Sequence, residues 1–323
     1  MLYDKFMEIK VPVLYLIVPC YNEEPILRDS AQQFKAKLEA LINAKKVTTD
    51  SRIMFIDDGS NDSTYQIITD LYHSSPLFCG LKLSRNRGQQ NAMLAGLSVA
   101  RAHADVTITI DADLQDDLNA LDKMLDEYMN GAEIVYGVRS TRKKDTFFKR
   151  VSAHAFYKTM LRMGVDIVYD HSDFRLLSKN AMNALAEYTE SNVFLRGLIP
   201  QLGFKTAKVT YPRAERQGGK SKYNPASLMS LALEGITSFS SKPLTAIFWL
   251  GFWLHILGLI GFVTTMVLMF TLGLHFMWTL LSAMVWLTGL LLIALGIIGF
   301  YLGKTYLETK HRPRFIIEEI LDQ

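Results

Sequence analysis

Two aspartates separated by a single residue, Asp111 and Asp113, directly follow the apolar run Val106–Ile110. Carboxylates at this spacing, just past the end of a strand, approach one point as the chain turns. Mg²⁺ commonly takes one or two carboxylates with phosphate oxygens of a substrate, and the carbonyl of Gln115 offers another oxygen. Such a metal would bridge a diphosphate and stabilise charge on a departing group. Asp-x-Asp is also common in ordinary turns, so its meaning depends on the loops nearby.

Two further loops contain residues suited to a nucleotide. Asp57-Asp58-Gly59-Ser60 follows the apolar run Ile53–Ile56. Its carboxylates either cap the next helix or accept hydrogen bonds from a base or ribose, and we expect the second role for Asp58. The loop Ser84–Asn91 joins a strand to a helix, where Arg87 and the helix N-terminus either meet phosphate or are simply solvated.

Short β-rich apolar runs alternate with helical patterns and predict how these loops are positioned. The alternation favours an α/β fold with a largely parallel, doubly wound sheet, in which ligands bind beyond the carboxyl ends of the strands. Three loops with distinctive residues fall at that edge: Pro19–Glu24 after the first strand, Asp57–Ser60 after the second and Asp111–Asp113 after the fourth. The predicted strands are Val13–Val18, Arg52–Ile56, Phe78–Leu83, Val106–Ile110 and Glu133–Tyr136, and the predicted helices are Ile26–Ile42, Ser63–Tyr72, Gln89–Ala102 and Leu118–Met129.

Beyond Gly137 the pattern changes, and basic residues gather ahead of a long apolar stretch. Arg213–Tyr223 is the densest cationic segment, and its two consecutive glycines predict mobility. It either closes over phosphates and excludes water or forms a patch against anionic lipid. The amphipathic segment Phe147–Met163 lies on a membrane surface or packs on the sheet, and we expect an interfacial helix at Pro225–Ser241.

The stretch from Pro243 to Gly303 contains no Asp, Glu, Lys or Arg. A hydrocarbon core of about 30 Å needs roughly 20 apolar residues per helix, so the stretch has room for two spans, Ala246 to about Phe270 and Trp278–Leu302. A buried hairpin in a soluble protein is the alternative, which the length and the absence of charge disfavour. Basic residues flank the pair and are absent from the connecting turn, so the positive-inside rule predicts that both ends are cytoplasmic.

The composition fits one membrane-anchored globular domain, with 323 residues, 49% hydrophobic residues and a net charge of +3. Met1–Lys10 is polar and is not a signal sequence. Cys20 and Cys79 have no metal or redox spacing and suit a reducing compartment. We expect a multi-pass cell-membrane protein without a nucleic-acid partner, divided into a cytoplasmic head (1–224), a juxtamembrane amphipathic helix (225–242), two transmembrane helices (243–303) and a cytoplasmic tail (304–323).

Six motifs occur in one order along the chain: Pro19-Cys-Tyr-Asn-Glu-Glu24, Asp57-Asp-Gly-Ser60, Arg85-Asn-Arg-Gly88, Asp111-Ala-Asp-Leu-Gln115, Asp173-Phe-Arg-Leu176 and Gly219-Lys-Ser-Lys-Tyr223. Together they resemble the polyprenyl-phosphate glycosyltransferases of glycosyltransferase family 2, which are similar to dolichol-phosphate mannosyltransferase and bactoprenol glucosyltransferase. The resemblance covers essentially the whole chain. It implies a GT-A fold, a nucleotide-sugar donor such as a UDP-linked hexose, a polyprenyl-phosphate acceptor such as undecaprenyl phosphate, and Mg²⁺ or Mn²⁺.

The resemblance also assigns roles by position. Asp173 is implied as the catalytic carboxylate, and a homo-oligomer is implied, for which Gly299-x-x-x-Gly303 offers a close-packing face. The residues implied to hold the nucleoside are Pro19, Tyr21, Glu23 and Asp58; those implied to hold the metal are Asp111, Asp113 and Gln115; those implied to hold phosphates of donor and acceptor are Arg139, Lys149, Arg150, Arg216, Ser221 and Lys222.

The reaction expected from this resemblance is an inverting transfer that serves glycosylation of a cell-envelope polysaccharide. A phosphate oxygen of the lipid attacks the anomeric carbon, and the nucleoside diphosphate leaves. A phosphate monoester has a second pKa of about 6, so the acceptor is already largely anionic near neutral pH. Asp173 therefore either acts as a base or positions Arg175 or the acceptor.

Three other interpretations stay open. A processive synthase shares the head but normally carries a Gln-x-x-Arg-Trp motif, which does not occur here. A retaining transferase would give the other product anomer. A catalytically inactive membrane scaffold, or an accessory subunit of a glycosylation complex, is disfavoured by the intact Asp-x-Asp and Lys-Ser-Lys-Tyr segments. Since two such spans offer no polar path for a sugar, we expect a separate flippase and a downstream transferase.

Overall fold

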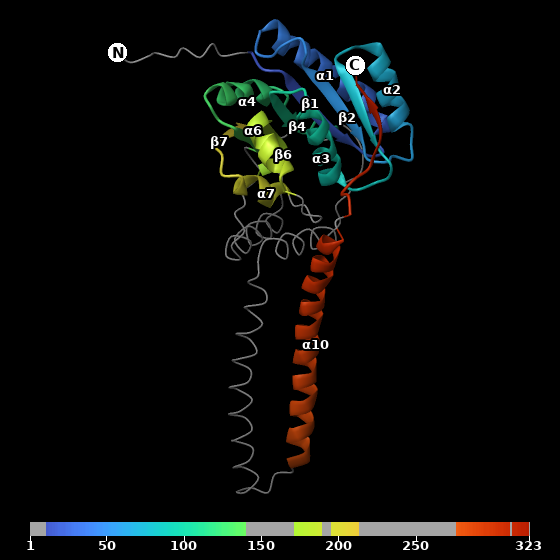
Figure 1. The fold of residues 1–323 in the computed structure, drawn as a ribbon, viewed down its shortest axis with the longest axis vertical. Coiled ribbons are helices and arrows are strands. Elements are labelled where there is room, and N and C mark those ends of the chain that lie inside the picture. The colour runs from blue at the N-terminus through green and yellow to red at the C-terminus, as the bar shows by residue number, and fades with distance from the viewer. Residues whose placement is uncertain (1–10, 140–170, 189–194, 213–275, 311, 323) are drawn as a thin grey trace, which may run out of the picture.

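The computed structural model describes residues 11–139, 171–188, 195–212, 276–310 and 312–322. Strands and helices alternate from the first strand to the fifth, as the apolar pattern predicts (Figure 1). In chain order the elements are β1 (Leu14–Cys20), α1 (Glu24–Asn43), β2 (Arg52–Asp57), α2 (Thr64–Ser74), β3 (Phe78–Leu83), α3 (Gln89–Ala100), β4 (Val106–Thr109), α4 (Ala120–Met129), β5 (Ile134–Arg139), β6 (His171–Ser178), α6 (Lys179–Ala186), α7 (Leu195–Gln201), β7 (Thr206–Tyr211), α10 (Phe276–Thr309) and β8 (Ile317–Leu321).

The strands of the described residues form one mixed sheet in the order β7-β5-β6-β4-β1-β2-β3-β8. β1 pairs in parallel with β2 and β4, β2 pairs in parallel with β3, and β5 pairs in parallel with β7. β6 is antiparallel to both β4 and β5, and β8 is antiparallel to β3. The expectation of a mostly parallel sheet therefore holds for every described strand except β6 and β8, which run the other way.

Helices cover both faces of this sheet (Figure 1). One core cluster lies between the sheet and α1, α2 and α4, where Phe34, Phe55 and Leu121 are fully buried. The other cluster lies between the sheet and α3, α6 and α7, and includes Met93 and Ile199. Each such side chain contributes about 1.5–3 kcal/mol through burial. Two packed layers hold the sheet rigid, so its edge loops are presented from a fixed platform.

The direction of β6 decides where its first residues lie. His171 pairs with Val138 of β5, and Arg175 pairs with Thr109 of β4. Because β6 runs against its neighbours, its amino end lies beside their carboxyl ends. At its other end, the hydroxyl of Ser178 accepts the backbone N–H of Ala181 at 3.1 Å and caps α6.

The end of the chain returns to the sheet as β8. The first residue of this strand, Ile317, pairs with Leu83 at the carboxyl end of β3, and the backbone N–H of Ser84 donates to Ile316 at 3.0 Å. Lys82 and Glu318 form an ion pair of 2.8 Å across the two strands. Of the expected tail, residues 304–323, the first part continues α10 and the last part contains the edge strand β8.

The helix α10 has 34 residues and extends away from the head (Figure 1). It contains the second predicted span, Trp278–Leu302. The first predicted span and the expected helices at Phe147–Met163 and Pro225–Ser241 lie outside the described residues. Among the described residues, no helix satisfies the joint requirement of length and hydropathy for crossing a membrane.

Every strand and helix predicted between Val13 and Tyr136 is present, with ends shifted by three residues or fewer. The largest shift is in β5, which continues to Arg139 because β7 pairs along it as far as Tyr211. The elements from β6 onward, apart from the apolar helix, had no prediction. Their patterns are short, and β6 and β8 take their positions from long-range pairing rather than from local periodicity.

Candidate active site

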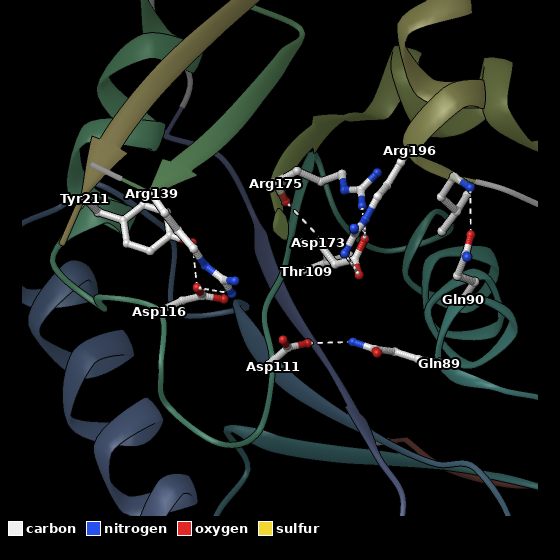
Figure 2. Close-up of polar contacts among 11 residues, drawn as sticks. Gln89, Gln90, Thr109, Asp111, Asp116, Arg139, Asp173, Arg175, Arg196 and Tyr211 are labelled. Atoms are coloured by element: carbon white, nitrogen blue, oxygen red, sulfur yellow. Dashed lines mark hydrogen bonds and ion pairs between the residues drawn. The ribbon is translucent and has the colours of Figure 1, made fainter. Parts of the chain in front are cut away.

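Asp111 lies two residues beyond the end of β4, among other acidic side chains at the carboxyl edge of the sheet (Figure 2). The pKa of the Asp111 carboxyl is raised to about 7, first by burial and then by the negative charges of Asp116, Asp173 and Asp113, against the opposing charge of Arg139. Its Oδ1 accepts a hydrogen bond of 2.7 Å from the side-chain amide of Gln89. The predicted carboxylate pair therefore belongs to a larger charged cluster.

The loop after Asp111 has an unusual backbone. Leu114 has a φ of 52°, in the left-handed region that a bulky residue rarely adopts, and its side chain is only 7% exposed. The turn lets the Oδ1 of Asp113 accept the backbone N–H of Gln115 at 3.2 Å. Strain of this kind costs about 1–3 kcal/mol and is tolerated where the surroundings fix the loop. The turn at Leu114 orients Asp113 before it and Gln115 after it.

Asp116, which sequence reasoning did not select, is part of the same cluster. Its side chain is 1% exposed, and its Oδ1 accepts from Arg139 at 3.1 Å and from the hydroxyl of Tyr211 at 2.5 Å. Its Oδ2 is buried and has no hydrogen-bond donor among the described residues. Arg139, expected to meet a phosphate, is thus held by a carboxylate and lies against the Asp111 loop (Figure 2).

Asp173 is held by two arginines. Its Oδ1 accepts from Arg175 at 2.5 Å, and Arg196 of α7 reaches it with two bonds, Nε to Oδ1 at 3.2 Å and Nη2 to Oδ2 at 3.0 Å. The Asp173 side chain is 13% exposed and that of Arg175 is 1% exposed. The hydroxyl of Thr109, at the end of β4, donates to the backbone carbonyl of Asp173. This places the expected catalytic carboxylate at the same edge as Asp111.

The two loops expected to hold a nucleoside lie side by side. β1 and β2 pair up to Cys20 and Asp57, and the backbone N–H of Asn22 donates to the hydroxyl of Ser60 at 3.0 Å. The predicted residues Pro19, Tyr21 and Glu23 are half-buried in the first of these loops. Residues that follow two neighbouring strands are thus brought to one place.

Asp58 has a structural role that the sequence did not predict. Its two carboxylate oxygens accept the backbone N–H groups of Arg87 and Gly88 at 2.7 and 2.8 Å. It therefore fixes the loop that leads into α3, while burial raises the pKa of its carboxyl against the effect of these bonds. Gly59 allows the contact, because a Cβ there would lie 2.6 Å from the backbone of Arg85.

The first two residues of α3 connect the parts of the site. Gln89 donates to Asp111, and the Oε1 of the next residue, Gln90, accepts the backbone N–H of Leu195 at 2.7 Å (Figure 2). Leu195 is the first residue of α7, which carries Arg196. Neither glutamine was selected from the sequence, since a glutamine at a helix start gives no signal without its distant partner.

The structure brings together Asp111, Asp113, Gln115, Arg139 and Asp173 at one edge of the sheet. Arg87 lies in the adjacent loop, anchored by Asp58. Arg196 was missed because the sequence did not predict α7. The remaining predicted site residues lie outside the described part of the chain; they are Lys149, Arg150, Arg216, Ser221 and Lys222.

The donor set at the edge fits a divalent cation that shares its ligands with a substrate. Four carboxylates, those of Asp111, Asp113, Asp116 and Asp173, meet three guanidinium groups, and the raised pKa of the Asp111 carboxyl reflects first its burial and then the negative charges of its acidic neighbours. Within the described residues, no three His, Cys, Asp or Glu side chains are arranged to hold a metal alone. Mg²⁺-type sites commonly complete their coordination with water and substrate phosphate.

Comparison with known proteins identifies the family of the chain. The family model described as glycosyl transferase family 2 matches residues 15–185. The uncharacterized glycosyltransferase YkoT of Bacillus subtilis (strain 168) is 42% identical over 95% of this chain and 91% of its own length. The bactoprenol glucosyl transferase of Shigella phage SfV is 35% identical over 94% of this chain and 97% of its own length. The chain therefore belongs to glycosyl transferase family 2 and is a glycosyltransferase with a GT-A-like mixed sheet.

Among solved structures, glucosyl-3-phosphoglycerate synthase from Mycobacterium tuberculosis, in complex with Mn²⁺, UDP-glucose and phosphoglyceric acid, is 14% identical. The match covers 70% of this chain and 78% of that chain, with a TM-score of 0.46.

Proposed function

We propose that the protein transfers a hexose from a nucleotide sugar, such as a UDP-linked hexose, to polyprenyl phosphate at the cytoplasmic face of the cell membrane. The acceptor is a lipid phosphate of the undecaprenyl type, and the product supplies a cell-envelope glycan. Relatives at 34–35% identity that are named bactoprenol glucosyl transferases support this acceptor, since they align with 94% of this chain.

One observation supports the proposal that the acceptor is a lipid. β8 begins opposite Leu83, at the carboxyl end of β3, only eight residues after Thr309 ends α10. The apolar helix α10 joins the head near the start of β8 (Figure 1). This is the edge of the sheet at which the parallel strands end, and Asp111 follows β4 at the same edge. A phosphate presented at the surface of a bilayer would meet the site from that side. This arrangement favours a membrane-bound acceptor over a freely diffusing one.

Membrane attachment is proposed for the charge-free stretch Pro243–Gly303. At about 1.5 Å per residue, the 34 residues of α10 extend about 51 Å, which exceeds the roughly 30 Å of a hydrocarbon core. Large apolar side chains are exposed along this helix, including Met277, Leu280, Met284, Leu287, Leu291, Ile298 and Leu302. An exposed apolar surface of this length is more stable in contact with lipid than in contact with water.

On the donor side, Asp111 and Asp113 would hold Mg²⁺ or Mn²⁺, and Gln115 would add an oxygen. The metal would supply positive charge to the diphosphate of the donor. The loops at Pro19–Glu23 and Asp57–Ser60 would hold the nucleoside, and Arg139 would be aimed at phosphate by Asp116. The positions of these groups at one edge of the sheet support a single donor site.

The proposed chemistry is one in-line displacement. An oxygen of the lipid phosphate forms a bond to the anomeric carbon, and the bond from that carbon to the donor diphosphate breaks with inversion. The nucleoside diphosphate takes the electron pair. An acceptor phosphate with a second pKa of about 6 needs little deprotonation at neutral pH. Asp173 then serves mainly to orient the neighbouring charged groups and the acceptor. A separate flippase and a downstream transferase would use the product.

Transfer can be tested directly. Membranes containing the protein are incubated with undecaprenyl phosphate and radiolabelled UDP-glucose, UDP-N-acetylglucosamine, UDP-galactose or GDP-mannose. We expect one label to become extractable into organic solvent, and we expect NMR of the product to show an inverted anomer. Membranes with Asp111→Asn serve as the control. Donor binding without transfer to any of several polyprenyl phosphates would instead indicate an inactive accessory subunit.

A further inference from the structure

The helix α7 is attached to the site at two points. Its first backbone N–H, that of Leu195, donates to Gln90 on α3, and its second residue, Arg196, makes two bonds to Asp173 on β6. The apolar side chains of Leu195, Leu198 and Ile199 pack in the core on the same face of the sheet. A short helix held by these polar contacts and by its packing has little freedom to move Arg196.

Asp173 needs such a partner. Its hydrogen bond with Arg175 uses one carboxylate oxygen, and Arg175 is itself buried at 1% exposure. The Arg196 guanidinium spans both carboxylate oxygens, which fixes the plane of the carboxylate as well as its position. A buried ion pair is weak evidence for stability, since desolvation offsets much of the attraction. The bidentate geometry therefore indicates orientation rather than stability.

We propose that Arg196 is a positioning residue for Asp173, and that Gln90 makes this positioning depend on α3. The adjacent Gln89 holds Asp111, so two consecutive glutamines join the donor-side carboxylate to the acceptor-side carboxylate through the start of one helix (Figure 2). A displacement of α3 at this point would move both carboxylates together. The inference rests on the proposed transfer reaction for its catalytic part only.

The catalytic part is tested in the full-length protein with undecaprenyl phosphate and the nucleotide sugar that wild type uses. Arg196→Ala is expected to lower kcat by about 10- to 50-fold with an unchanged donor KM, since a misplacement of about 1 Å can cost about 100-fold. Arg196→Lys keeps the charge but loses the bidentate geometry, so it recovers only part of the activity. Millimolar guanidinium is expected to rescue Arg196→Ala, whereas urea at the same concentration is not.

A double-mutant comparison separates positioning from a direct contact with substrate. If Arg196 acts through Asp173, Arg196→Ala has no further effect on kcat in an Asp173→Ala background. Full additivity of the two losses would overturn the inference. The matched control is Arg28→Ala, which removes an arginine from an exposed 2.7 Å ion pair with Asp70 on the opposite face of the sheet and leaves transfer unchanged.

The structural part is tested by amide hydrogen exchange and does not need an acceptor. Arg196→Ala and Gln90→Leu are each expected to speed exchange at Leu195–Ile199 by about tenfold, while β1 is unaffected. Gln90→Glu keeps an oxygen acceptor and is expected to exchange as wild type does. Unchanged exchange at α7 in both disruptive variants would overturn the inference for any acceptor. A wild type that transfers no sugar would instead refute the proposed function, and exchange alone would then decide the inference.

Discussion

At the scale of single residues, most opposite charges at the sheet edge come from separate elements, although Asp173 and Arg175 both lie on β6. Asp111, Asp113 and Asp116 belong to one loop, whereas Arg139, Arg175 and Arg196 come from β5, β6 and α7. Arg139 and Arg196 each contact an aspartate across at least 23 residues of sequence. Charge balance in the site is therefore a property of the fold, and the acidic loop alone would carry an excess of negative charge.

The carboxylates of this edge are expected to differ in importance. Asp113→Ala removes a proposed metal ligand and is expected to lower kcat by about 1,000-fold, because charge on the leaving diphosphate loses its stabilisation. Asp173→Ala is expected to cost less, about 100-fold, because the acceptor phosphate is already anionic. Both are measured as transfer rates with excess Mg²⁺ or Mn²⁺, and Asp70→Ala on the exposed surface serves as the control. Equal turnover of Asp113→Ala and wild type would refute the metal assignment.

At the scale of elements, the loops of the site are fixed by contacts between backbones. Gly59 has a φ of 66° and lies where a Cβ would be 2.6 Å from atoms of Arg85 and Asn86. Gly203 has a similar φ of 72°, but a Cβ there would have no neighbouring atom within 4 Å. The two glycines thus separate the effect of backbone conformation from the effect of crowding.

Gly59→Ala is expected to lower the free energy of unfolding by about 3 kcal/mol, because it adds a backbone clash to the unfavourable φ. Gly203→Ala is expected to cost only about 1–2 kcal/mol, from φ alone. Thermal unfolding of the full-length protein in detergent gives the comparison. Donor binding should weaken in Gly59→Ala alone. Equal shifts in Tm for the two variants would mean that the backbone at Arg85 and Asn86 moves to accommodate the new Cβ without a loss of stability.

The strand β8 offers a second test at this scale. Removing residues 312–323 exposes the edge of β3 and removes the packing of Leu321, which lies against the core. The burial of one such side chain contributes about 2 kcal/mol, which predicts a fall in Tm of about 4–8 °C. Deletion of Gln323 alone is the control. A truncated protein with an unchanged Tm would show that β8 does not stabilise the head.

The sequence predicted the elements with strong local periodicity and the loops that follow parallel strands. The carboxylate pair, the loop at Asp57 and the strand β3 are where the pattern placed them. It did not predict β6 or β8, because an antiparallel strand is recognised by its partner rather than by its own residues. Asp173 was consequently identified as a candidate without a location, and Arg196 was not identified. The role of Asp58 in fixing the loop of Arg87 was also missed. Both of its donors are backbone N–H groups, which residue types alone do not reveal.

At the scale of the whole molecule, the helix α10 and the head are joined by a short segment. α10 ends at Thr309, and β8 starts at Ile317. Arg314 in this segment donates to the backbone carbonyl of Tyr188, which follows α6. Arg314 is therefore fixed against the head. Under the proposed function, this contact sets the height of the site above the lipid surface.

Lengthening this connection is expected to impair transfer selectively. Six inserted Gly/Ser residues after Lys310 add a flexible reach of about 13 Å. Transfer to undecaprenyl phosphate in vesicles is expected to fall about tenfold, because the effective concentration of the acceptor falls. Transfer to farnesyl phosphate in detergent should be unchanged. The same insertion in the exposed turn at Thr49-Asp50 is the control, and equal losses at both positions would contradict a role for the connection.

The late position of β8 in the chain has a consequence for biosynthesis. Lys82 and its partner Glu318 are 236 residues apart. At 5–20 residues per second, about 10–50 seconds separate the synthesis of β3 from that of the strand that covers it. During this time the β3 edge is open to pairing with other chains. A ribosome-bound chain that is stalled before residue 312 should therefore bind chaperones or aggregate through this edge, and its release should depend on translation of the last twelve residues.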